Sequence, residues 1–181
     1  MISEITARAK PNSRVQYYLS ASLFTVGIVG FLLTNLLDRY VGIAQFCAIL
    51  PIIAAIFILV KYCLSTPTYD ISFNDEGRAM LVVRSVSGRR FHPVCFAFLA
   101  HVTSVTAETP EERGAHKTAS GCALYTSTAS MRPDVTYRVS ADTNGSHKEI
   151  VLECSEEFAN LIRTYAGEAR ENEKEDEDDE D

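Results

Sequence analysis

The stretch that decides the fold is FILVKYCLSTPTYDISF, residues 57–73. Residues 57–60 are apolar without a break, whereas Tyr69, Ile71 and Phe73 alternate with polar residues. A continuous apolar run is typical of a membrane-spanning helix, and alternation with a period of two is typical of a half-buried strand. The sequence therefore predicts a bilayer segment that leads into a β-domain with almost no linker.

Two long stretches on the N-terminal side of this junction, 19–37 and 41–60, contain no charged residue. A helix needs about 20 mostly apolar residues to cross a bilayer, and both stretches are that long. One alternative is a pair of buried helices in a soluble protein, which usually keep a polar stripe. Another is a cleaved signal peptide, which is shorter and ends at small residues. We predict a transmembrane helical hairpin over residues 15–63, because only residues 38–40 connect the two stretches.

Lysine and arginine residues flank the outer ends of the predicted helical hairpin, and only one arginine lies in its connection. Cations near membrane spans favour the cytoplasmic face. Both chain ends are therefore expected in the cytoplasm, and residues 1–14 form a basic cytoplasmic segment. The flanking cations are Arg8, Lys10, Arg14, Lys61, Arg78, Arg84, Arg89 and Arg90.

Small residues in the two spans allow another helix to come close. Small residues four positions apart are typical of helix contacts in membranes, and a proline inside a span removes a backbone donor and favours a kink. Two explanations stay open, which are packing inside the helical hairpin and docking against another membrane protein. The candidate packing residues are Gly27, Gly30, Ala44, Ala48, Pro51 and Ala55.

An antiparallel β-domain is predicted over residues 66–170. Asn144-Gly145 favours a tight hairpin turn, Pro93 marks an edge or a break, and residues 109–117 form a polar loop. Seven segments have strand patterns, and they are 69–73, 79–86, 90–98, 101–108, 119–128, 134–141 and 148–154.

The C-terminal part is predicted to be an amphipathic helix over residues 155–169, followed by an acidic tail. Ser155 is a suitable cap, and apolar residues at 158, 161, 162 and 165 form one stripe. The tail, residues 171–181, carries a net charge of −8, whereas the whole chain carries −7, so the rest is nearly neutral. Such a tail cannot bury enough apolar surface to fold, and we expect it to be disordered. It either keeps the C-terminus in the cytosol or attracts a basic partner.

About seven strands followed by one helix resemble the pleckstrin-homology-like (PH-like) fold. The segments YDISFNDEG at 69–77 and KEIVLECSEEFANLIRTYAGEA at 148–169, together with the two spans, resemble small bacterial membrane proteins with a PH-like domain of the YcxB type. The resemblance implies an α+β membrane protein of a bacterial plasma membrane. Fold alone does not imply a function.

Catalytic and metal-binding signals are sparse. The five cysteines have irregular spacing without a C-x-x-C pair, which argues against a disulfide framework and a zinc site. His92 and Cys95 lie three residues apart on a strand and so point to opposite faces. No glycine-rich phosphate loop and no basic, aromatic-rich face is found. We expect no enzyme, no cofactor, no metal site and no nucleic-acid partner.

Arg84, Arg89 and Arg90 surround a predicted turn at Ser87-Gly88. In PH-like domains the turn between the first two strands often carries phosphate-binding cations, so the resemblance implies a headgroup or partner site here. Ordinary surface arginines at a solvated turn remain the alternative. The function that we expect is a membrane-anchored scaffold that binds a protein or anionic lipid headgroups at the cytoplasmic surface. The alternative is an accessory or assembly subunit of a transporter or membrane enzyme, docked through its helical hairpin.

Overall fold

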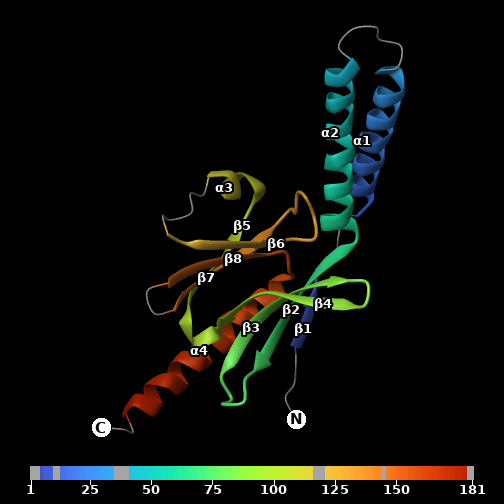
Figure 1. The fold of residues 1–181 in the computed structure, drawn as a ribbon. Helices are drawn as coiled ribbons and strands as arrows, with labels where there is room; N and C mark the ends of the chain where they lie inside the picture. Colours follow the sequence, from blue (N-terminus) through green and yellow to red (C-terminus); the bar gives the residue numbers. More distant parts are fainter. Residues whose placement is uncertain (1–4, 10–12, 35–40, 116–120, 144–145, 179–181) are drawn as a thin grey trace. The chain divides into compact units, whose positions relative to one another are not determined.

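The computed structural model describes residues 5–9, 13–34, 41–115, 121–143 and 146–178. The chain divides into two compact units (Figure 1). Pro11–Ser65 form a helical unit, and Met1–Lys10 together with Thr66–Asp181 form a β-domain. The predicted α+β class, with two long apolar helices near the N-terminus, is confirmed.

The helical unit consists of α1 (Ser13–Leu33) and α2 (Val41–Ile58), and a π-helical turn at Leu59–Cys63 follows α2. The two helices lie side by side (Figure 1). By length and composition, Arg14–Leu33 and Val41–Cys63 are each able to cross a membrane. The predicted connection at 38–40 lies outside the described residues.

The first sheet of the β-domain contains four strands in the order β1-β2-β3-β4. Tight turns join its last three strands. After β2, the Asn74 side chain accepts hydrogen bonds from the Glu76 and Arg78 amides, and Gly77 has a positive φ of 80°. The strands are β1 (Ile5–Arg8), β2 (Ser65–Phe73), β3 (Ala79–Ser87) and β4 (Arg90–Phe98).

Strand β1 was not predicted, because a four-residue segment is too short for a period of two to stand out. It pairs antiparallel with β2, with Ile5 opposite Ile71 and Arg8 opposite Thr68. Pairing with an existing sheet supplies the hydrogen bonds that such a short strand cannot make alone. Residues 1–14, which were predicted to be a basic cytoplasmic segment, therefore include a strand of the β-domain. The helical unit lies in the sequence between two paired strands of this domain.

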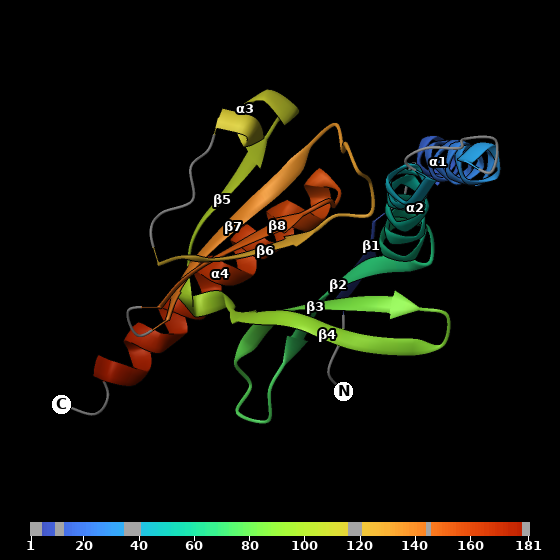
Figure 2. The ribbon, with the colours of Figure 1, turned by 45° about the horizontal axis from the view of Figure 1, so that its top comes forward.

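The second sheet has the order β5-β7-β8-β6, and it is mixed rather than antiparallel throughout. Strand β6 runs parallel to β8, with Ala123 opposite Lys148. Strands β5 and β6 lie at opposite edges of this sheet (Figure 2). The strands are β5 (Val102–Glu108), β6 (Ala123–Ser127), β7 (Thr136–Thr143) and β8 (Ser146–Leu152). The described residues thus form eight strands in two sheets, where about seven were predicted.

A short helix, α3 (Pro110–Ala115), stands where a polar loop was predicted. Thr109 and Glu112 form a capping box: the Thr109 amide donates to the Glu112 carboxylate, and the Glu112 amide donates to the Thr109 hydroxyl. Pro110 occupies the first helical position, which proline favours. The letters TPEE at 109–112 contain this signal, so the helix was predictable from the sequence.

The last helix, α4 (Glu156–Asp178), packs into a core that both sheets share. Ser155 caps it as predicted, because the Phe158 amide donates to the Ser155 hydroxyl. The predicted apolar stripe faces the core, where Phe158 and Ile162 are buried. The largest fully buried core residues from the strands include Tyr69, Ile71, Leu81, Val139, Ile150 and Leu152.

Helix α4 continues beyond its predicted end at residue 169, into the segment for which the sequence predicts a disordered acidic tail. The backbone of α4 is helical through Asp178. Glutamate has a high helix propensity, and extending an existing helix avoids the cost of nucleation. The last three residues of the tail lie outside the described residues.

The predicted turn at Asn144-Gly145 also lies outside the described residues. The residues on either side of it, Thr143 and Ser146, are paired between β7 and β8.

Candidate functional site

The predicted arginine cluster is split by the structure. Arg84 forms an ion pair with Asp70 at 3.2 Å, and Asp70 is almost fully buried. Arg89 and Arg90 instead are exposed at the turn that connects β3 to β4, where Gly88 has a positive φ of 60°. This turn joins the third and fourth strands, not the first two, so its position differs from the one implied by the PH-like resemblance. Arg84 thus has a structural partner.

Strand β4 adds apolar residues to this turn that the sequence did not single out. Phe91 and Phe96 are 63% and 54% exposed, and Val94 is also exposed. Alternation explains the exposure of Phe96, because its neighbours Cys95 and Ala97 face the core. Val94 is the extra residue at the register shift, and beyond this shift Phe91 lies opposite Val86 instead of facing the core. We call the exposed set of Arg89, Arg90, Phe91, Val94 and Phe96 the β4 surface.

The β4 surface lies on an edge strand of the first sheet. Exposed edges invite pairing with other chains, and proteins commonly block them with proline or a bulge. Both devices are present here: Pro93 removes a backbone donor, and the register shifts between Val83 and Arg84. These features disfavour strand addition at this edge and leave the side chains as the means of contact.

The candidate packing residues of the helical unit lie mainly between α1 and α2. A Cβ atom at Gly27 would stand 2.4 Å from Ile52 Cγ1, and one at Gly30 would stand 3.5 Å from Ala48 Cβ. Ala48 and Ala55 are buried, and the Ser20 hydroxyl donates to the Ala55 carbonyl at 2.9 Å. Ala44 and Pro51 are half-buried, and α2 continues past Pro51.

A buried ion network, which the sequence analysis missed, lies on the second sheet. The Arg138 guanidinium donates to both carboxylate oxygens of Glu108, at 2.6 and 3.0 Å, and to Glu149 at 2.5 Å. All three side chains are buried. Hydrogen bonds to Glu108 raise the pKa of Arg138, so this guanidinium stays charged. Because Arg138 and Glu149 alternate with the core residues Val139 and Ile150, the network occupies the face opposite the core.

Helix α3, which follows β5, contacts this face through Arg113. Arg113 of α3 donates to the Thr136 hydroxyl at 3.1 Å and to the Pro133 carbonyl at 3.3 Å. Thr136 is fully buried. Arg113 therefore covers Thr136, which lies on the same outward face as Arg138, and no signal in the sequence pairs these distant positions.

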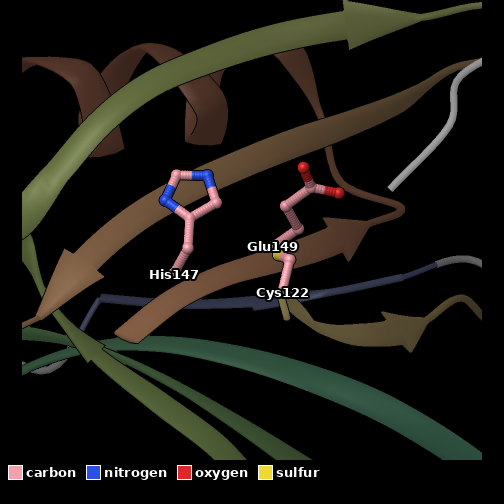
Figure 3. Close-up of side chains that lie close together, drawn as sticks. All are labelled: Cys122, His147 and Glu149. Atoms are coloured by element: carbon pink, nitrogen blue, oxygen red, sulfur yellow. The ribbon is translucent and has the colours of Figure 1, made fainter. Parts of the chain in front are cut away.

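Next to this network, Cys122, His147 and Glu149 come together (Figure 3). Their ligand atoms all lie within 4.8 Å of one another. Cys122 and His147 are half-buried, and Glu149 is buried. Burial, together with the nearby Glu149 carboxylate, raises the pKa of the Cys122 thiol. Among the described residues, these three could together hold a metal ion, and their spacing in the sequence does not predict such a site.

Other candidate nucleophiles are poorly suited to catalysis. Burial raises the pKa of Cys95 to about 11 and that of Cys154 to about 12, so both thiols are protonated at neutral pH. His92 is exposed on β4, whereas Cys95 faces the core. The His101 ring contacts the Asp142 carbonyl at 3.1 Å. In comparisons of the chain with protein-family models, curated proteins and solved structures, nothing matches.

Proposed function

We propose that this chain is a membrane-anchored, non-enzymatic interaction protein whose β-domain binds anionic lipid headgroups through the β4 surface. The helical unit is the anchor. The two helices have the length and apolar composition that a bilayer requires, and large apolar side chains such as Phe46, Ile53 and Phe57 are exposed on α2.

The connectivity of the chain supports a helical hairpin rather than two independent membrane segments. Strand β1 precedes α1, and its partner β2 follows the π-helical turn after α2. Since β1 and β2 are hydrogen-bonded to each other, both ends of the helical unit leave from the same side of a bilayer. The lysine and arginine residues near these ends favour the cytoplasmic side of a plasma membrane.

The observation that carries the lipid proposal is the β4 surface. Two exposed arginines stand beside exposed phenylalanines. Arginines bind phosphate groups, and aromatic rings favour the headgroup level of a membrane. Each cation near an anionic surface contributes on the order of 1 kcal/mol, so the two arginines together change affinity by roughly 30-fold.

The PH-like layout remains part of this proposal. Two sheets around one core with a C-terminal helix support it. The parallel pairing of β6 with β8 is a departure from the antiparallel layout that the resemblance implied. The alternative function, docking of a transporter or enzyme subunit on the small residues of α2, has less support, because Ala48 and Ala55 are buried.

The proposal can be tested with a single fluorescent reporter, because the chain contains no tryptophan. The variant Phe91→Trp places an indole on the β4 surface, and Leu124→Trp, at an exposed position of β6, is the matched control. Full-length protein is reconstituted into nanodiscs with and without phosphatidylserine. We expect brominated lipids to quench the Phe91→Trp emission only when anionic lipid is present.

The charge of the turn provides the second arm of this test. Arg89→Glu combined with Arg90→Glu should abolish the quenching of the Phe91→Trp variant, and Leu124→Trp should not be quenched in any nanodisc. Equal quenching with and without anionic lipid would contradict the role of the arginines. If no quenching occurs and the emission changes only on addition of a protein partner, the lipid proposal is wrong and a protein-binding scaffold replaces it.

A further inference from the structure

We propose that Cys122, His147 and Glu149 form a binding site for one divalent transition-metal ion, most suitably Zn²⁺. The site goes beyond membrane anchoring and lipid binding, because it lies on the second sheet and does not include any residue of the β4 surface. Three observations support it, which are the strand register, the groups that orient the ligands, and the chemistry of the donor set.

The register of two neighbouring strands places the three ligands together. Strand β6 runs parallel to β8 with Ala123 opposite Lys148, so Cys122 stands beside His147 at the start of the pair. His147 and Glu149 are two positions apart on β8 and therefore share one face of the sheet. In the view of Figure 3, one ring nitrogen of His147 lies on the side of Glu149, and the other lies away from it.

The distances suit a small tetrahedral site. In zinc sites the metal–nitrogen and metal–oxygen bonds are about 2.0–2.1 Å and the metal–sulfur bond is about 2.3 Å, so ligand atoms stand roughly 3.3–3.8 Å apart. The ligand atoms here lie within 4.8 Å of one another before any metal binds. Closing the site therefore needs side-chain movements on the order of 1 Å, which rotamer adjustments supply without a change of strand register.

Two neighbouring carboxylate and guanidinium groups are placed to orient the ligands, as is usual around metal sites. His147 Nδ1 lies 4.0 Å from a carboxylate oxygen of Asp142, which is beyond hydrogen-bond distance but within reach after a small side-chain rotation, and the other ring nitrogen lies on the side of Glu149. Arg138 holds Glu149 in place with a hydrogen bond to Oε2. Because Arg138 also bonds both oxygens of Glu108, its positive charge is shared between two carboxylates and does not belong to Glu149 alone.

The donor set selects the class of metal. A thiolate and an imidazole favour zinc and related transition metals, whereas Mg²⁺ and Ca²⁺ prefer sites made of oxygen ligands. Three protein ligands leave the fourth position of a tetrahedral site for a water molecule. Binding would displace the proton of the Cys122 thiol and join the edge strand β6 to β8.

Co²⁺ is the probe for the test, because a thiolate bound to it gives a charge-transfer absorption band that carboxylates alone do not give. Full-length protein in detergent micelles is titrated with Co²⁺. We expect one equivalent to bind with a thiolate band that Zn²⁺ then abolishes, and Cys122→Ser to lose this band. Cys154→Ser, a change at a partly buried thiol outside the proposed ligand set, is the matched control and should keep it.

His147→Ala keeps the test informative if Cys122→Ser fails to fold, because this half-buried side chain is outside the ion network of Arg138. We expect His147→Ala to weaken Co²⁺ binding at least tenfold, and Asp142→Asn to weaken it by roughly tenfold, in the range for groups that orient a metal ligand. A binding curve without a thiolate band, or a band that persists in folded Cys122→Ser, would overturn the proposal and assign the binding to other carboxylates or thiols.

Discussion

Tyr69 connects the two sheets through its hydroxyl group. In β2 it donates to the Ser127 carbonyl at 2.5 Å and accepts a hydrogen bond from the Glu153 amide at 3.1 Å. Burial is the main reason that the pKa of Tyr69 is raised, so the hydroxyl keeps its proton at all physiological pH values. A single side chain thus satisfies two backbone groups from segments far apart in sequence.

Removing this hydroxyl should destabilise the β-domain. We expect Tyr69→Phe to lower the free energy of unfolding by about 1–3 kcal/mol, because it leaves a carbonyl and an amide without their partner. Tyr165→Phe is the control, since its hydroxyl makes no hydrogen bond within the described part of the chain, and it should change stability by less than about 0.5 kcal/mol. Urea denaturation followed by circular dichroism measures both values; equal effects would contradict the bridging role.

Cys154 provides a prediction about pH. Burial raises its pKa to about 12, compared with about 8.5 for an unperturbed thiol. At pH 8 the thiolate fraction, and with it the rate of alkylation by iodoacetamide, should be roughly a thousandfold lower in the folded protein than in urea. Mass spectrometry of the peptide that contains Cys154 measures the rate, and similar rates in both states would show that the thiol is not shielded.

The direction of the stability change follows from the same shift. The folded state holds the Cys154 proton more tightly than the unfolded state does, so this thiol stabilises the fold below pH 8.5. That contribution decreases as the pH rises from about 8.5 towards 12. Replacing Cys154 by alanine should therefore make the decrease in stability between about pH 8.5 and 12 smaller. Thermal denaturation at several pH values measures this decrease.

Among the elements, α1 and α2 of the helical unit depend on close approach at Gly27. A Cβ there would stand 2.4 Å from Ile52 Cγ1 and 3.1 Å from the Ala48 carbonyl oxygen. Gly27→Leu should therefore force α1 and α2 apart and lower the melting temperature of the helices in detergent micelles. Gly42→Leu is the matched control, because no atom lies within 4 Å of a Cβ at that position. If both variants have the same melting temperature, the close packing at Gly27 does not stabilise the helix pair.

The elements also show how far the sequence could be interpreted. Both apolar helices, the seven longer strands and the start of α4 have strong local signals, such as period-two alternation and the Ser155 cap. Strand β1 lacks such a signal, because its stability comes from pairing with β2. Helix α3 carries a readable capping box at Thr109, but its six residues are too few for an apolar stripe to indicate a helix.

The candidate sites show the same division between local and long-range information. Arg89 and Arg90 were identified because they lie next to a turn, whereas the pairing of Arg84 with Asp70 depends on strand register. Cys122 and His147 are 25 positions apart in the chain, and only the parallel pairing of β6 with β8 brings them together. Periodicity in the sequence indicates which face a residue occupies but not which strand lies beside it.

At the scale of the whole molecule, the β-domain encloses the helical unit in sequence. Arg8 of β1 pairs with Thr68 of β2, so joining Lys10 directly to Thr66 leaves a four-residue connection between paired strands. Loops of this length are common in β-hairpins. We expect the chain without residues 11–65 to be soluble and to unfold cooperatively, as measured by circular dichroism. An excised chain that aggregates or lacks β-structure would contradict the independence of the β-domain.

The central claim is that the helical unit anchors an otherwise soluble β-domain in a membrane. The most direct measurement is fractionation of cells that express either the full chain or the chain without residues 11–65, followed by an alkaline wash of the membranes. We predict that the full chain stays in the washed membrane pellet and that the excised chain is found in the soluble fraction. Release of the full chain into the supernatant without detergent would contradict the account.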